Sequence, residues 1–356
     1  MSAVSPIRQP HMPFALSALA QALPALAALP VAAQLRQLAG QGLAHLPPPG
    51  AGQTLQRWRA LGRVAQHDLS LAKLYEGHTD ALAILHELGD GRFQSGDEET
   101  ATWAVWAAEA PGQRVRVVPQ GHGGWATLSG TKAWCSGAQG LSHALLTAWL
   151  PGQEQSQLVA VRLDHPSLHM DTGAWQAVGM ADTLSAEVTF DGTPAKLVGG
   201  TGDYLRRPGF WHGGAGIAAC WHGGTLAVAD ALYHGMRSVA PNHPGFAGRA
   251  AAFGRVDRVL AGTAALLQQA AAWIDAHPRA DAMALALRLR QTAEVAALAV
   301  VEETGRALGA TPYCRDAVFA RAAADLPVFI RQSHGVRDDA ALASALLAQE
   351  DYPWAW

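Results

Sequence analysis

The chain has 356 residues, of which 49% are hydrophobic and 15% are charged, and its formal net charge is −3. It is long enough for roughly two or three domains with a large core, and its charge gives no electrostatic reason to bind nucleic acid or an anionic membrane. The three cysteines form no CxxC pair and the fifteen histidines show no paired-ligand spacing. We therefore expect a cytoplasmic protein in a reducing compartment, without a metal site.

The first part of the chain is predicted to be helical. Residues 13–45 are rich in alanine and leucine, and the run Pro47–Gly50 ends these helices. Residues 14–33 also faintly resemble a secretory signal, but prolines and glutamines interrupt the run, and it is too short and broken for a membrane span. Apolar residues recur at helical spacing over 53–88, so we predict an all-helical domain over residues 1–98.

Residues 99–200 are predicted to form a compact antiparallel barrel or sandwich. Short apolar runs alternate with turn residues at a spacing of about ten residues, at 115–117, 125–128, 145–150, 158–163 and 188–190. We expect a strand over 125–132 that turns at Ser129-Gly130. The segment Trp134–Ala138 is expected to be a hairpin-like crossing to the next strand, and Asp191–Pro194 a closing turn.

Residues 201–356 return to a helical pattern. Apolar residues fall at alternating spacings of three and four, so each helix has one apolar face. Helices at about 212–237, 250–276, 281–308 and 315–348 are predicted to pack as an antiparallel bundle. Small residues such as Gly223 would allow close contact between helices.

The crossing carries residues suited to a planar ring with polar edges. Trp134 offers a flat indole, Ser136 a hydroxyl, and Gly137 room for close approach. The alternative is that Trp134 is a core aromatic residue and Ser136-Gly137 a plain turn. With Gly130 and Lys132, these residues stand in the positions of the G-x-K-x-W-I-T-N/S-G pattern, and the segment resembles the acyl-CoA dehydrogenase family.

Two further stretches, residues 61–85 and 179–191, resemble motifs of the same family in the expected order. The resemblance implies an α+β multidomain fold with an N-terminal helical domain, a central antiparallel β-barrel and a C-terminal four-helix bundle. It also implies FAD, with FMN as the alternative, bound between barrel and bundle. An acyl thioester substrate and a homodimer or homotetramer are implied as well.

The resemblance also assigns flavin contacts. The family's T-E-P-x-x-G-S-D loop corresponds to residues 107–114, so Ala108 and Glu109 are candidates. The Gly-Ser-Asp part, which holds the pyrimidine edge and phosphate, is missing, and this puts the affinity or pose of a flavin in doubt. Trp106, just before this loop, is expected to be a core residue of the barrel.

Three more candidates come from the bundle. Arg237 stands in a Y-x-x-x-R segment, whose arginine reaches the FAD pyrophosphate across the family's dimer; a solvated charge at a helix end is the equal alternative. Gly305 and Gly309 precede Arg315-Asp316-Ala317, which resembles the family's G-G-x-G … R-D-A sequence. Glycines there let a loop lie against the adenosine.

The catalytic base is missing from its usual places. Dehydrogenation of an acyl thioester removes an α-proton as hydride leaves for flavin N5, so it needs a carboxylate with a pKa tuned towards neutrality. The family's two glutamate positions fall at Ala324 and near Gly213. Asp325, beside Ala324, is a weak candidate, and a helix-to-turn cap is its alternative role.

Three functions follow in order of preference. The first is a flavin-dependent oxidoreductase of the acyl-CoA dehydrogenase type. The second is a catalytically inactive binding or scaffold subunit with the same fold. The third is the flavin-dependent monooxygenase branch, because Asp325-Leu326-Pro327 resembles that branch's H-D-P segment with Ala324 in place of the histidine.

Overall fold

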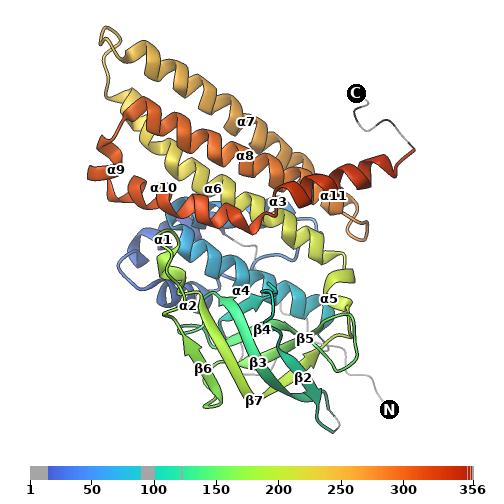
Figure 1. Ribbon diagram of the computed structural model, residues 1–356. Helices are drawn as coiled ribbons and strands as arrows, with labels where there is room; N and C mark the ends of the chain where they lie inside the picture. The colour runs from blue at the N-terminus through green and yellow to red at the C-terminus, as the bar shows by residue number, and fades with distance from the viewer. Residues whose placement is uncertain (1–14, 90–100, 122, 351, 353, 355–356) are drawn as a thin grey trace.

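The computed structural model describes residues 15–89, 101–121, 123–350, 352 and 354. Four helices come first, then a seven-stranded sheet, then the bundle (Figure 1). The first helices are α1 (Leu16–Leu26), α2 (Val31–Gly40), α3 (Thr54–His67) and α4 (Leu69–Leu88). The strands are β1 (Trp103–Trp106), β2 (Arg116–Pro119), β3 (Trp125–Cys135), β4 (His143–Ala148), β5 (Gln157–Arg162), β6 (Leu168–Asp171) and β7 (Ala186–Val198).

The bundle is built from three long helices, with one short helix before them and shorter ones after them. Its elements are α5 (Asp203–Arg206), α6 (Gly209–Arg237), α7 (Phe246–Ala276), α8 (Met283–Leu308), α9 (Thr311–Arg315), α10 (Ala317–Phe329) and α11 (Val336–Leu347). Figure 1 shows α6, α7 and α8 side by side on one side of α4 and the sheet on the other. One hydrophobic core runs through helices and sheet, since α3 packs on α6 and α4 packs on both α6 and β1. The predicted domain bounds stay a prediction.

The sheet is mixed and curls back on itself. Its order is β1-β4-β5-β7-β3-β2, with β6 also paired to β7. The pair β1–β4 is parallel, so the predicted antiparallel pairing is wrong for these two strands, while the predicted fold class is confirmed. An isolated bridge between Arg116 and Trp149 brings β2 beside the end of β4, and Trp149 N donates to Val115 O at 2.8 Å.

Three predicted turns are different in the structure. Ser129-Gly130 lies inside β3, where the register against β7 shifts after Leu128. Gly130 has a φ of +116°, and a Cβ there would lie 2.6 Å from Arg114 O, so this point of the strand requires glycine. Asp191–Pro194 lies inside β7 and contains the bulge: Leu128 pairs with Thr193 and Ser129 with Asp191, so Gly192, with a φ of +68°, is the extra residue. The segment after Trp134 is not a hairpin, because β3 and β4 are not neighbours in the sheet.

Three of the four predicted bundle helices match α6, α7 and α8 to within a few residues, but the single helix expected over 315–348 is wrong. Asp316 interrupts it and begins α10 by accepting hydrogen bonds from Val318 N and Phe319 N. A second break follows α10, where Gly335 has a φ of +50°. The chain then continues as α11, which contains no buried residue.

The contact between α3 and α6 confirms the expected role of Gly223. A Cβ on Gly223 would overlap the carbonyl oxygen of Gly62, so the two backbones touch directly. This contact fixes α6 against the N-terminal helices. In the part of the chain that the structure describes, no helix is long and apolar enough to cross a membrane.

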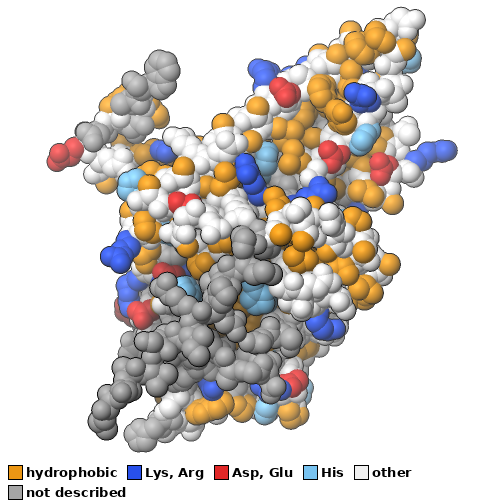
Figure 2. All heavy atoms as spheres, turned by 180° about the vertical axis from the view of Figure 1, so that it is seen from behind, with side chains coloured by type: hydrophobic (Ala, Val, Ile, Leu, Met, Phe, Trp, Pro, Cys, Tyr) orange, Lys and Arg blue, Asp and Glu red, His pale blue; other side chains and the backbone are white. Residues whose placement is uncertain are grey.

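The bundle also leaves hydrophobic side chains exposed, among them Phe253 on α7 and Val295 and Leu298 on α8. Seen from behind, hydrophobic and charged side chains are interspersed along the bundle (Figure 2). The homodimer or homotetramer stays a prediction.

His78 makes stability depend on pH. It is fully buried on α4, its Nδ1 accepts from Trp103 N at 3.2 Å, and burial lowers its pKa to about 3. An unfolded histidine titrates near pH ~6.5, so below that pH the unfolded chain takes up a proton that the native protein does not. His78 therefore costs no stability above this pH, and stability falls as the pH drops towards 3, by up to about 1.4 kcal/mol per pH unit.

The variant His78→Asn tests this dependence. Asparagine keeps an acceptor for Trp103 N but does not titrate, so the free energy of unfolding should depend less steeply on pH between 6 and about 4. Urea unfolding at a series of pH values measures the two slopes. Equal slopes in wild type and variant would show that His78 is not the group responsible.

Candidate functional site

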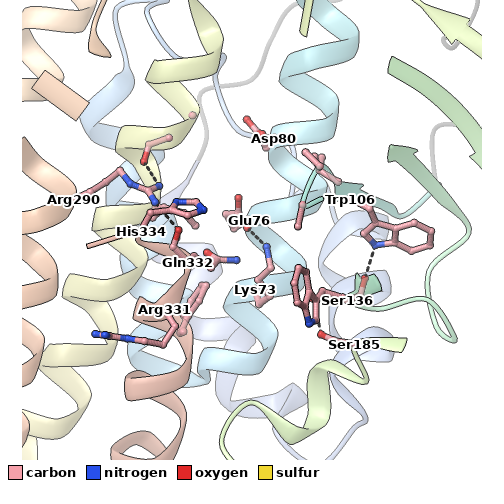
Figure 3. A pocket seen from close by; sticks show the side chains of 18 of the residues that line it. Lys73, Glu76, Asp80, Trp106, Ser136, Ser185, Arg290, Arg331, Gln332 and His334 are labelled. Carbon is pink, nitrogen blue, oxygen red and sulfur yellow. Dashed lines mark hydrogen bonds and ion pairs between the residues drawn. The ribbon is translucent and has the colours of Figure 1, made fainter. Parts of the chain in front are cut away.

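A cavity of about 710 Å³ lies where the sheet meets the bundle (Figure 3). This volume is in the range of about 300–1,000 Å³ that ligand pockets usually have. The sheet contributes the end of β1 with residues 105–108, the crossing at Trp134 and Ser136, and the segment 180–185. The facing wall comes from α4, α6, α8 and the residues between α10 and α11.

The crossing presents an indole and a chain of hydroxyls to the cavity. Trp134 is 52% exposed, so the alternative of a core residue is wrong, although residues 136–140 do form a turn. Ser136 Oγ lies 2.8 Å from Ser185 Oγ, which in turn lies 2.9 Å from Thr183 Oγ1. Trp106 is buried, as predicted, and its Nε1 donates to Ser136 O at 3.1 Å. The site thus combines a flat apolar face with a polar edge.

The backbone around the cavity is strained. Trp134, Met180 and Leu184 have φ values of +56°, +61° and +42°, in a region that side chains disfavour. Such conformations cost about 1–3 kcal/mol each and persist only when neighbouring structure holds them. Trp134 and Met180 line the cavity, so the strain is concentrated where a ligand would bind.

Asp325 holds the Met180 segment rather than lining the cavity. It is buried inside α10, where its Oδ1 accepts from Met180 N at 2.5 Å, and burial raises its pKa. The predicted cap role is therefore wrong. Beside it, Gly179 packs against Ala324 O so closely that a Cβ would overlap this oxygen. The Asp325 side chain thus connects the segment at Met180 to α10.

Of the two loop candidates, Ala108 lines the cavity and Glu109 does not. Glu109 Oε1 accepts from Lys132 Nζ at 2.8 Å and from Thr147 Oγ1 at 2.5 Å. Lys132 is only 2% exposed, and burial lowers its pKa while Glu109 partly offsets this effect. This buried pair ties the loop after β1 to β3 and β4, so Glu109 positions the loop.

The candidates from the bundle lie far from the cavity. Along α6, Gly214 and Arg237 are separated by about 35 Å. Gly309, at the end of α8, has a φ of +69°, and Gly305 lies one turn before it. A Cβ on Gly235 would meet Leu308 Cδ2 at 2.8 Å, so the ends of α6 and α8 are neighbours. Within one chain, Arg237, Gly305 and Gly309 form a separate group.

The sequence reading missed the stripe that α4 turns towards the cavity. Lys73, Glu76 and Asp80 follow helical spacing and all line the cavity. Arg290, from α8, lies across from them (Figure 3) and donates to Gly214 O and Gln332 O at 3.3 and 2.9 Å. Charged residues at helical spacing on an otherwise largely apolar helix are the sequence pattern that would have identified these residues.

Comparisons with known proteins support the architecture. No family model and no curated protein matches the chain. Solved structures do match. KijD3 in complex with FMN and dTDP-3-amino-2,3,6-trideoxy-4-keto-3-methyl-D-glucose is 18% identical, with 96% of this chain and 95% of that chain covered and a TM-score of 0.80. This chain has an acyl-CoA dehydrogenase-like fold.

Two other solved structures give the same result. A nitrososynthase from Micromonospora carbonacea var. africana is 20% identical, with 97% of this chain and 99% of that chain covered and a TM-score of 0.76. TdsC from Paenibacillus sp. A11-2, in complex with FMN and indole, is 16% identical, with 95% and 97% covered and a TM-score of 0.75. At these identities the likeness concerns the fold.

Proposed function

We propose that this chain is a flavin-dependent oxidoreductase that binds FMN or FAD in the cavity between sheet and bundle. The observation that carries the proposal is Trp134, a strained and half-exposed indole at the cavity beside the hydroxyls of Ser136 and Ser185. A strained, exposed aromatic residue at a cavity has no role in core packing. Two of the solved structures with this fold are complexes with FMN.

The residues present fit the ring of a flavin. The Trp134 indole supplies an apolar face, and Ser136, Ser185 and the backbone at Ala108 supply polar partners for one edge. The Gly-Ser-Asp part of the family loop is missing, so other residues must hold the phosphate. Arg237 would be available to this cavity only from a second subunit, which is the reason to expect a homo-oligomer.

Oxygenation is the reaction that these residues favour. A bound reduced flavin supplies two electrons for the activation of dioxygen, whereas thioester dehydrogenation needs a carboxylate base. The base positions implied by the family fall at Ala324 and near Gly213, and the two acids that line the cavity, Glu76 and Asp80, stand on α4 instead. The residues of this chain would exclude water and hold the substrate against the ring, with the aromatic side chains as the apolar lining.

The absorbance spectrum from 300 to 550 nm tests the proposal. Protein mixed with FMN or FAD and then gel-filtered should keep a flavin spectrum, and bound flavin should quench tryptophan fluorescence. Loss of both signals with both cofactors would sink the enzyme proposal and leave a scaffold subunit. With a flavin retained, substrate-dependent oxygen uptake driven by an external flavin reductase is expected. Bleaching of the flavin by acyl-CoA without oxygen uptake would instead indicate a dehydrogenase.

Replacing Trp134 with alanine should weaken flavin binding about tenfold, since loss of one stacking contact costs about 1.4 kcal/mol. Trp125→Ala is the matched control, because Trp125 lies on the same strand and is 49% exposed but does not line the cavity. Fluorescence titration gives both dissociation constants. Equal weakening by both substitutions would show that the effect is not local to the cavity.

A further inference from the structure

Asp80 projects from α4 into the cavity with an oxygen that has no partner (Figure 3). On the same face of α4, Glu76 is paired with Lys73 Nζ at 3.0 Å. Asp80 Oδ1 is buried without a hydrogen bond, and Asp80 forms no ion pair with any residue that the structure describes. A buried acceptor without a partner costs free energy, so a hydrogen-bond donor on a ligand in the cavity would be stabilised at this oxygen.

The structure around Asp80 leaves room for its carboxylate. A Cβ on Gly213 of α6 would lie 2.7 Å from Asp80 Oδ1, so any side chain there would displace it. The carboxylate therefore lies against the backbone of α6 at Gly213.

The arginine side chains near Asp80 form their hydrogen bonds with other groups. Arg207 Nη1 donates to Glu87 at 2.9 Å, and Arg290 donates to backbone oxygens. Arg57 interacts with Asp80 only through space, without a hydrogen bond between them. Asp80 thus has a through-space partner in Arg57 but no hydrogen-bonded cation, and its Oδ1 can accept a hydrogen bond from a ligand in the cavity.

The lining near Asp80 is aromatic. Tyr204, Phe210 and Trp211 line the cavity, with edge-to-face ring contacts at 5.4 Å and 5.1 Å between successive centroids. Aromatic faces attract cations, and a carboxylate forms its strongest hydrogen bonds with charged donors. An unpaired carboxylate among aromatic rings is complementary to an ammonium group on an apolar body.

We propose that the cavity takes a substrate carrying a protonated amine, and that the Asp80 carboxylate receives the ammonium group. The inference rests on the proposed function and deepens it by naming the class of substrate. Asp80 accepts a charge-assisted hydrogen bond, while the apolar part of the substrate lies against Tyr204, Phe210 and Trp211.

The test uses the full chain with whatever flavin it retains and three probes of matched shape: 2-phenylethylamine, 2-phenylethanol and 3-phenylpropionate. At millimolar concentration the amine should raise the thermal unfolding midpoint, and calorimetry should give it at least tenfold tighter binding than the neutral alcohol or the anion. Equal binding of amine and alcohol, or no binding of the amine, overturns the inference.

Asp80→Asn should reduce amine affinity at least tenfold, whereas Glu76→Gln should keep most of it because Glu76 is already paired with Lys73. Gly213→Ala displaces the carboxylate and should weaken amine binding in the same direction as Asp80→Asn. If Asp80→Asn folds and binds the amine as tightly as wild type does, the assignment of Asp80 is wrong. If this variant does not fold, the comparison of the three probes on the wild-type protein decides the question.

Flavin retention is measured on the same samples. If the protein binds flavin but does not prefer the amine, the inference about Asp80 is wrong and the proposed function still stands. Preference for the amine without flavin binding sinks the proposed function and leaves Asp80 as an ammonium site.

Discussion

Replacing Gly223 with alanine is expected to lower the free energy of unfolding by about 3 kcal/mol, because backbone atoms of α3 cannot yield as a flexible side chain would. The new Cβ would overlap Gly62 O, so α3 and α6 must move apart and lose packing along their contact. Urea unfolding followed by circular dichroism measures the change.

Gly254→Ala is the matched control for this substitution. Gly254 also lies inside a long helix, α7, but a Cβ there would meet no atom within 4 Å. Alanine is the better helix former by about 1 kcal/mol, so this variant should be more stable than wild type. Similar behaviour of the two variants would mean that the α3–α6 contact is looser than the structure shows.

Lys132→Met is expected to destabilise the protein by about 2 kcal/mol, because it leaves the Glu109 carboxylate without its buried cation. The value is below that for a fully buried pair, since the Glu109 side chain is 34% exposed and keeps part of its hydration. The loop with Ala108 would also lose its attachment to β3, so flavin retention should fall as well. Urea unfolding and the gel-filtration assay measure the two effects.

The double variant Glu109→Gln with Lys132→Met separates charge from packing. Removing both charges should recover about 1 kcal/mol relative to Lys132→Met, because no unpaired carboxylate remains. Additive losses in the cycle would contradict the ion pair as the source of the effect.

Sequence periodicity predicted the long helices because α6, α7 and α8 each keep one apolar face over many turns. It failed over 315–348 because a cap at Asp316 and a left-handed Gly335 interrupt an otherwise helical composition. Ser129-Gly130 was predicted as a turn because a glycine that favours turns also occurs inside strands, where another part of the backbone approaches closely. Only the partner strand β7 distinguishes the two.

The candidate site was predictable only where its residues are close in sequence. Trp134 and Ser136 belong to one short motif, and both line the cavity. Asp80 was missed because an acid on a helix is read as facing solvent until the neighbouring helix and sheet are known. The parallel pairing of β1 with β4 is likewise non-local, since about forty residues separate them.

The walls of the cavity differ in how tightly they are packed. Where Gly179 meets Ala324 O, sheet and α10 touch through their backbones, and little can move there. On the other side His334 and Asp338 belong to a segment held by Gln291 Nε2, which lies 2.7 Å from Ser333 Oγ and 3.3 Å from Asp338 Oδ2. Since α11 buries no residue, its opening should expose little apolar surface and should happen on a shorter timescale than any separation of sheet and bundle. Substrate and product would therefore pass beneath α11, where the contacts to break are hydrogen bonds from Gln291 and Arg290 and the ion pair of Arg331 with Glu294 rather than the packing of the core.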